Sequence, residues 1–308
     1  MPREPSSPAR PTQLSIRRRS LGALLSLVAP GAGQALAGRV VRGAGWLLAQ
    51  LVLTVLALVV PVLAVVGAAA VRLAGALDCV LMSGPRHGVP TPQRAAWWVA
   101  AVVAVYWGSA WLVRTFLVEA FKTPADSMAP TLRAGDYFFV QKSLYQINSG
   151  RLVAYVPPNG DGTLFVKRVV AVEGDVVRLA RGRLSINGQR VPREPLSQPC
   201  IGSPFPFCRR YREAIGGRRI EVQQAEGTVP PVPDVAGRCP AGTTPEGRGC
   251  KVAPGHLFAL GDHRDNSVDS RNHGAVSIDS VIGVPTDIWL AFDPAGGIDW
   301  SRIGRQIP

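Results

Sequence analysis

The sequence has little charge for its size. Asp, Glu, Lys and Arg make up 18% of the 308 residues, whereas hydrophobic residues make up 47%. An average soluble domain carries about a quarter charged residues, so a wholly soluble protein is not expected. A disordered chain is excluded as well, because disordered chains are poor in apolar residues. The length predicts one large domain with a second part, or two domains.

Acidic residues are scarce in the first third of the chain, where residues 1–94 hold ten Arg against two acidic residues. These arginines flank apolar stretches, as the positive-inside rule describes for the cytoplasmic ends of membrane spans. The sequence also lacks a zinc-finger spacing and an aromatic RNA-binding strand. Although Lys and Arg number 34 against 21 Asp and Glu, we therefore expect membrane lipid, and no nucleic acid, as a partner.

The apolar stretches predict a cytoplasmic basic tail at 1–20 and a membrane region at 21–113 with about three spans. A span needs ~20 apolar residues, and the stretch 44–82 is long enough for two. The last span is predicted at 95–113, with tryptophans near its ends. An odd number of crossings places residues 114–308 outside. Two models satisfy this: 44–60, 62–82 and 95–113, or 21–38, 44–71 and 95–113.

Cysteines are few, and four of the five fall in the outer part. Cys79 lies in an apolar stretch and is interpreted as a small hydrophobic residue. Cys200, Cys208, Cys239 and Cys250 form an even set in an oxidising compartment, which predicts disulfides. Local pairing, 200 with 208 and 239 with 250, is one of three arrangements. A zinc site is the alternative, but no C-x-x-C or His partner stands at ligand spacing, so no metal is expected.

From residue 137 onward, short β-branched and aromatic runs alternate with Gly, Pro, Asn and Asp turns, including the turn signal at 157–160. The segment 190–254 is rich in Pro, Gly and Arg, holds the four outer cysteines, and predicts an irregular, stapled insertion. The expected fold class is a mainly β domain anchored by N-terminal transmembrane helices. Strands are predicted at 137–140, 151–156, 164–172, 176–179, 183–186, 257–260 and 281–290.

Two polar residues stand out in otherwise stiff or apolar surroundings. Ser127 is the single serine in a segment, 123–132, that two prolines stiffen shortly after the last predicted span. Lys167 lies inside the apolar run 165–170, and it is one of only four lysines beside 30 arginines. Arg does not deprotonate in proteins, whereas burial can lower the pKa of a lysine from ~10.4 into the range of a general base.

The third feature is the segment 261–271, dense in Asp, Asn, Ser and Arg after an apolar strand. This composition is typical of a hydrogen-bonded loop that holds a site in place. A metal loop is the alternative, because Asp262, Asp265 and Asp269 could present oxygen ligands. The Gly and closing Glu of an EF-hand are absent, however, and the two arginines of the loop would repel a cation.

The boxes P-A-D-S-M-A-P-T-L, F-V-K-R-V-V-A-V-E-G-D and G-D-H-R-D-N-S-V-D-S-R, in this order after membrane spans, resemble bacterial type I signal (leader) peptidases over most of 114–290. The resemblance implies a multi-pass serine endopeptidase of the bacterial cytoplasmic membrane with its catalytic domain on the outer, periplasmic side. It would remove signal peptides with A-x-A-like ends from exported preproteins, need no cofactor, and have the secretion machinery among its contacts.

Residue by residue, the resemblance implies that Ser127 is the nucleophile and Lys167 the general base of a Ser–Lys dyad. Ser267 matches the serine that hydrogen-bonds and orients this lysine. Met128 matches an apolar neighbour near the membrane surface. The remaining matches are structural residues near the site: Arg168, Asp262, Asp269 and Arg271.

The chain departs from the family beside the nucleophile. The family usually reads S-G-S-M, where the first hydroxyl helps to form the oxyanion hole, but here Ala125 and Asp126 occupy the first two positions. Losing one such donor costs ~10²–10³ in rate. This departure favours two alternatives: a specialised peptidase of a secretion or conjugation system, and a catalytically impaired membrane-tethered binding domain.

A Ser-His-Asp site is a further alternative, although nothing in the sequence links Ser127 to a histidine. His263 also replaces an Asn that is usual in the family, which we interpret as a minor change. The histidines of this part of the chain are His256, His263 and His273.

Overall fold

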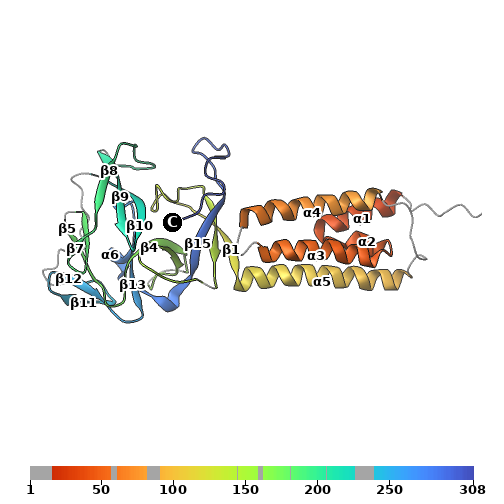
Figure 1. Ribbon diagram of the computed structural model, residues 1–308, viewed down its shortest axis with the longest axis horizontal. Coiled ribbons are helices and arrows are strands. Elements are labelled where there is room, and N and C mark those ends of the chain that lie inside the picture. The colour runs from red at the N-terminus through yellow and green to blue at the C-terminus, as the bar shows by residue number, and fades with distance from the viewer. Residues whose placement is uncertain are drawn as a thin grey trace, which may run out of the picture. The chain divides into compact units, whose positions relative to one another are not determined.

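The chain forms two compact units, Met1–Phe116 and Leu117–Pro308. The computed structural model describes residues 16–56, 61–81, 91–143, 145–158, 162–180, 182–205, 207–225 and 239–308. Figure 1 shows that the first unit is helical and that the second consists mainly of strands. The mainly β fold class expected for the second unit is therefore confirmed.

The first unit contains five helices among its described residues, and one of them, α5, is long and apolar enough to cross a membrane. It covers the last predicted span. The prediction of three crossings is not supported by the described residues. The 21–38 stretch is divided between α1 and α2, and the described residues of the 44–71 stretch belong to α3 and α4. The helices are α1 (Ile16–Val28), α2 (Ala32–Leu36), α3 (Val40–Leu56), α4 (Pro61–Leu81) and α5 (Pro92–Phe116).

Several expectations for this unit fall outside the described residues. These are the first fifteen residues of the predicted basic tail, and residues 57–60 and 82–90 of the predicted membrane region. Within the described part, glycines around α2 allow close backbone packing. A Cβ on Gly31 would lie 2.2 Å from the carbonyl oxygen of Gly43, and a Cβ on Gly33 would lie 2.0 Å from that of Gly22. These contacts explain why the chain can break and turn there.

The second unit is built on a seven-stranded antiparallel sheet with the order β1-β2-β15-β3-β4-β13-β14. Strand β4 is an interior strand between β3 and β13, and the consecutive buried residues in its middle show that both of its faces are covered. Each of the predicted strands in this sheet is confirmed. The strands are β1 (Val118–Lys122), β2 (Tyr137–Gln141), β3 (Leu152–Tyr155), β4 (Phe165–Val172), β13 (His256–Leu260), β14 (Val276–Ser277) and β15 (Val281–Leu290).

Two smaller sheets complete this unit, with the orders β11-β12-β5-β6-β7 and β10-β9-β8. Strands predicted at 176–179 and 183–186 are confirmed as β5 and β6. Two short elements, α6 (Ser270–His273) and the 3-10 turn Ile278–Ser280, follow β13. The strands of the two sheets are β5 (Val176–Ala180), β6 (Arg183–Ile186), β7 (Gln189–Arg190), β8 (Arg193–Leu196), β9 (Cys208–Ile215), β10 (Arg218–Ala225), β11 (Thr243–Glu246) and β12 (Gly249–Val252).

The prediction that the insertion, residues 190–254, is irregular was wrong for its described part, which contains β8 to β12. Strands β9 and β10 pair residue for residue across a Gly216-Gly217 turn. Alternation places Ile215, Ile220 and Val222 in the core, but the arginines between them hide the pattern in the sequence. Residues 226–238 of the insertion, and residues 159 and 160 of the predicted turn at 157–160, lie outside the described residues.

The cysteines pair locally. Disulfides join Cys200 to Cys208 and Cys239 to Cys250. This is the local pairing, one of the three pairings that the sequence left possible. Cys79 is buried and free, as expected of a small hydrophobic residue. Since the four outer thiols are consumed in disulfides, they cannot ligate the zinc ion considered as the alternative.

Candidate active site

Ser127 lies in the turn that connects β1 and β2, and this turn is anchored by apolar side chains. Met128 is 1% exposed and packs in one core cluster with Leu132 and Phe138. The carbonyl oxygen of Ser127 accepts a hydrogen bond from the backbone N–H of His263, at 3.2 Å. The serine hydroxyl is thus held at a fixed place at the side of the main sheet.

Lys167 projects from the middle of β4 and meets the Ser127 hydroxyl. Its Nζ lies 2.8 Å from Ser127 Oγ, in hydrogen-bond contact, and 5.5 Å from the centre of the Phe165 ring. The lysine side chain is buried, with 4% of the residue exposed. Burial lowers the pKa of Lys167 from 10.5 to about 8, although the carboxylates of Asp269 and Asp262 act in the opposite direction. An alternating strand would also permit a surface lysine, which this burial excludes.

Both side chains border a cleft of about 380 Å³. Its lining is mostly apolar, with few polar groups apart from the serine and the lysine. A cleft of this kind suits an apolar ligand segment that is oriented by a small number of polar contacts. Apolar lining residues include Phe121, Met128, Leu132, Phe138, Leu164 and Val268.

The segment Gly261–Arg271, here named the support loop, is organised around the carboxylate of Asp269. This side chain is fully buried and accepts hydrogen bonds from the Gly261 N–H (2.9 Å), the Ser267 hydroxyl (2.8 Å) and two nitrogens of Arg271 (both 2.8 Å). Burial alone would raise the pKa of Asp269, but hydrogen bonds and the charge of Arg271 hold it below its ordinary value. Asp269 also caps α6. The loop therefore has a rigid, ionised centre.

Ser267 lies close to the nucleophile turn. A Cβ on Gly261 would lie 2.2 Å from Ser267 Oγ and 2.7 Å from the carbonyl oxygen of Ser127, so only glycine fits between them. Within the described residues, the Ser267 hydroxyl donates its hydrogen bond to Asp269. The role inferred from resemblance, orienting Lys167 by a direct hydrogen bond, stays a prediction.

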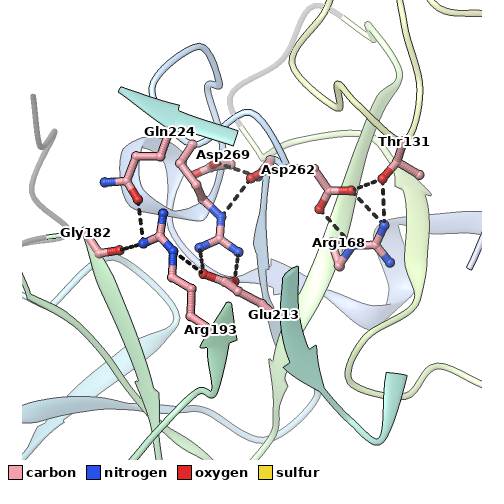
Figure 2. A network of polar contacts seen from close by, with 10 residues as sticks. Thr131, Arg168, Gly182, Arg193, Glu213, Gln224, Asp262 and Asp269 are labelled. Carbon is pink, nitrogen blue, oxygen red and sulfur yellow. Dashed lines mark hydrogen bonds and ion pairs between the residues drawn. The ribbon is translucent and has the colours of Figure 1, made fainter. Parts of the chain in front are cut away.

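Arg168 and Asp262 form a buried ion pair beside the site. The guanidinium donates to both carboxylate oxygens, at 2.8 and 2.7 Å, and to the carbonyl of Gly150. Thr131, in the nucleophile turn, donates to the same carboxylate at 2.5 Å. Figure 2 shows this group, in which Asp262 connects strand β4, the support loop and the nucleophile turn. The three sequence boxes thus converge in space.

His263, interpreted from the sequence as a minor change, is fully buried and contacts the nucleophile turn. Its ring Nδ1 lies 3.2 Å from the carbonyl oxygen of Asp126, and burial lowers the pKa of the ring. The carboxylate of Asp126 accepts a hydrogen bond from the Ala134 N–H. His263 is therefore a packing neighbour of the turn, a contact that the sequence did not reveal.

The Ser-His-Asp alternative is not supported by the described residues. The ring of His256 contacts the carbonyl of Pro254, and that of His273 contacts the Tyr155 hydroxyl at 3.0 Å. Within the described residues, the hydroxyl of Ser127 contacts Lys167.

The metal-loop alternative is not supported either. Each of the three aspartates is engaged by donors: Asp262 by Arg168, Asp265 by the Ala225 N–H and Asp269 by Arg271. No group of three or more metal-ligand side chains occurs in the described part of the chain.

Comparison with known proteins identifies the class. Residues 94–290 match the family described as "Signal peptidase, peptidase S26". A signal peptidase I from Pseudomonas fluorescens is 30% identical over 59% of this chain and 68% of its own. One from Bacillus licheniformis is 29% identical over 64% of this chain and 89% of its own.

The chain therefore belongs to the signal peptidase family, peptidase S26, and is a serine peptidase, a hydrolase. The resemblance inferred from the three boxes is confirmed. A solved signal peptidase I from Enterococcus faecalis V583 is similar to 46% of this chain over 98% of its own, at 21% identity and with a TM-score of 0.28.

Proposed function

We propose that this chain removes signal peptides from exported preproteins through an acyl-enzyme formed by a Ser127–Lys167 dyad. The observation that carries the proposal is the 2.8 Å contact between Lys167 Nζ and Ser127 Oγ inside a mostly apolar cleft. With a pKa of about 8, Lys167 is neutral in roughly a tenth of molecules at pH 7, so it can act as a base near neutral pH.

In the proposed mechanism, neutral Lys167 takes the proton from Ser127 Oγ as this oxygen attacks the carbonyl that follows a small side chain. The lysine then gives the proton to the leaving amine, and water releases the acyl group from the serine. Asp269 and Arg271 hold the support loop against the dyad, and Ser267 is proposed to orient the lysine. These roles are supported by burial and by the hydrogen bonds around Asp269.

The site lacks one of the hydrogen-bond donors expected for the oxyanion, because Ala125 carries no hydroxyl group. The backbone N–H of Ser127 remains available. The carboxylate of Asp126 is hydrogen-bonded within its own turn, to Ala134, which limits its repulsion of the developing negative charge. These features favour an active enzyme over a catalytically impaired binding domain.

We also propose that α5 anchors the chain in the bacterial cytoplasmic membrane, with the β unit on the outer side. Its hydropathy and length support an anchor, and the two disulfides fit an oxidising compartment. The partners would then be preproteins, the lipid around α5 and the secretion machinery.

The test is cleavage of preproteins by the detergent-purified full chain, beside the variants Ser127→Ala and Lys167→Ala. We expect cleavage after a small residue, lost in both variants. Activity that survives Ser127→Ala would refute the mechanism. If the parent chain leaves several ordinary preproteins uncut, the better function is a specialised peptidase with a dedicated substrate in a secretion or conjugation system. A preprotein that binds without being cut would indicate a catalytically impaired binding domain.

A further inference from the structure

The insertion is the part of the β unit that the proposed mechanism leaves without a role. Its strand β10 pairs with the start of the support loop. The Gln223 N–H donates to the carbonyl of Asp262, and the Arg264 N–H donates to the carbonyl of Gln223, both at 2.9 Å. Gln223 and His263 form a parallel bridge, and the Ala225 N–H donates to the Asp265 carboxylate. The loop thus continues the small sheet of the insertion.

A buried ion pair makes a second connection between the insertion and the loop. Glu213 of β9 accepts hydrogen bonds from both terminal nitrogens of Arg264, at 3.3 and 2.5 Å, while Arg264 Nε donates to the carbonyl of Gly261. Both side chains are at most 3% exposed. Figure 2 shows that Arg193 also lies beside Glu213 and bonds to Gly182 and Gln224.

Such a pair contributes little net stability, because removing two charges from water offsets most of their attraction. Its geometry, in contrast, is specific, since two parallel N–H donors fix the guanidinium relative to the carboxylate. A buried pair at this place therefore sets where Gly261 lies. Gly261 in turn contacts Ser267, Asp269 and the carbonyl of Ser127.

The Cys200–Cys208 disulfide makes a third connection. The side chain of Gln223, fully buried, exchanges two hydrogen bonds with the backbone of Ile201, at 2.9 and 2.6 Å. Ile201 follows Cys200, which is bonded to the first residue of β9. A Cβ on Gly202 would lie 2.4 Å from Asp126 Oδ2, so the disulfide-closed segment also packs against the nucleophile turn.

From these contacts we propose that the insertion positions the support loop against the dyad, with Glu213 and Gln223 as its positioning residues. The proposal rests on the proposed Ser127–Lys167 function, and it assigns the insertion a part in the reaction.

Displacement of the support loop would change the pKa of Lys167. Burial is the largest cause of its lowered pKa, and the charges that face it are those of Asp269, Asp262 and Arg271. If the loop moves away, water reaches Lys167 and its pKa rises from about 8 toward 10.5, because the loss of burial outweighs the loss of the attractive carboxylates. Fewer lysines are then neutral at pH 8, and the rate falls.

The experiment uses the full chain in detergent and compares Glu213→Gln and Gln223→Ala with Glu221→Gln. Glu221 is the matched control, since its carboxylate bonds to Arg210 and Arg212 within the same hairpin. Four quantities are measured: the melting temperature, kcat and KM for a preprotein, and the pKa of Lys167 by NMR of 13C-labelled lysine. The chain has only four lysines, and Lys167→Arg assigns the resonance.

We expect both positioning variants to lower kcat at pH 8 at least tenfold with a smaller change in KM, and to raise the pKa of Lys167. The control should match the parent chain in all four quantities. Unchanged kcat and unchanged lysine pKa in folded variants would overturn the proposal. So would a lower melting temperature with normal kcat per folded molecule, because that result indicates structural support alone.

Glu213→Gln leaves Arg264 buried without its partner and can prevent folding. Gln223→Ala leaves no such charge. The double variant Glu213→Leu with Arg264→Met removes both charges of this pair, while Arg193 keeps its hydrogen bonds to Gly182 and Gln224. The lysine pKa is measured without substrate, so it tests positioning even if the cleavage assay shows that Ser127 is not the nucleophile.

Discussion

The two irregular segments that meet at the candidate site are held by different forces. The nucleophile turn is anchored by apolar packing, with Met128 and Leu132 in the core beneath Ser127. The support loop is anchored by buried charges, chiefly Asp269 with Arg271 and Arg264 with Glu213. Apolar anchors tolerate shape-conserving substitutions, whereas a buried ion pair tolerates removal of one partner poorly. The two segments should therefore fail in different ways.

The largest effect is expected from Asp269→Asn. The change leaves Arg271 without its carboxylate and weakens acceptance from Ser267 and Gly261, so we expect a loss of about 3–5 kcal/mol in the free energy of unfolding. Cleavage should fall at least a hundredfold, because the loop no longer packs at Lys167. Denaturant unfolding and preprotein cleavage measure the two effects.

The control for this substitution is Glu246→Gln, which removes one partner of an exposed pair with Lys251. Exposed pairs contribute about 0–1 kcal/mol, so neither stability nor cleavage should change measurably. Equal losses in the two variants would show that burial of the charge is not what makes Asp269 important.

A smaller effect is expected when the apolar anchor is broken. Met128→Ala removes a fully buried side chain and should cost about 2–5 kcal/mol, with reduced cleavage because the turn beneath Ser127 is loosened. Met128→Leu keeps the volume and should cost less than about 1.5 kcal/mol with cleavage retained. Thermal melting and cleavage at one pH distinguish the two. Equal loss in both variants would mean that the turn needs the thioether itself rather than apolar volume.

The same contrast explains how much could be predicted from the sequence. Strands such as β4 and β15 were predictable, because a short run of β-branched and aromatic residues bounded by turn residues is a local pattern. The serine, the lysine and Asp269 were found through three boxes that a known family shares. The partner of Arg264 could not be found in this way. Glu213 lies 51 residues away in an arginine-rich strand, where an acidic residue is typical of a solvated surface.

The features that sequence analysis got wrong or missed depend on contacts between different segments of the chain. The β9–β10 hairpin was expected to be irregular because its arginines hide the alternation, although these residues pair across the two strands. The sequence predicted disulfides but left the local pairing as one of three arrangements, and the contact of the disulfide-closed segment with the nucleophile turn through Gly202 could not be predicted. Only the folded structure brings positions 126 and 202 together.

The smallest effect is expected from Ala125→Ser, which separates chemistry from anchoring in the nucleophile turn. Ala125 is exposed and borders the cleft, so a hydroxyl fits there without disturbing the core. We expect an unchanged melting temperature and a kcat that rises by up to about tenfold, because a second donor would stabilise the oxyanion beside the Ser127 N–H. The matched variant Ala125→Cys adds similar volume with a weaker donor and should give a smaller gain. If neither variant changes kcat while both fold normally, the transition state already has its full set of donors, and the rate is limited by how the support loop holds Lys167.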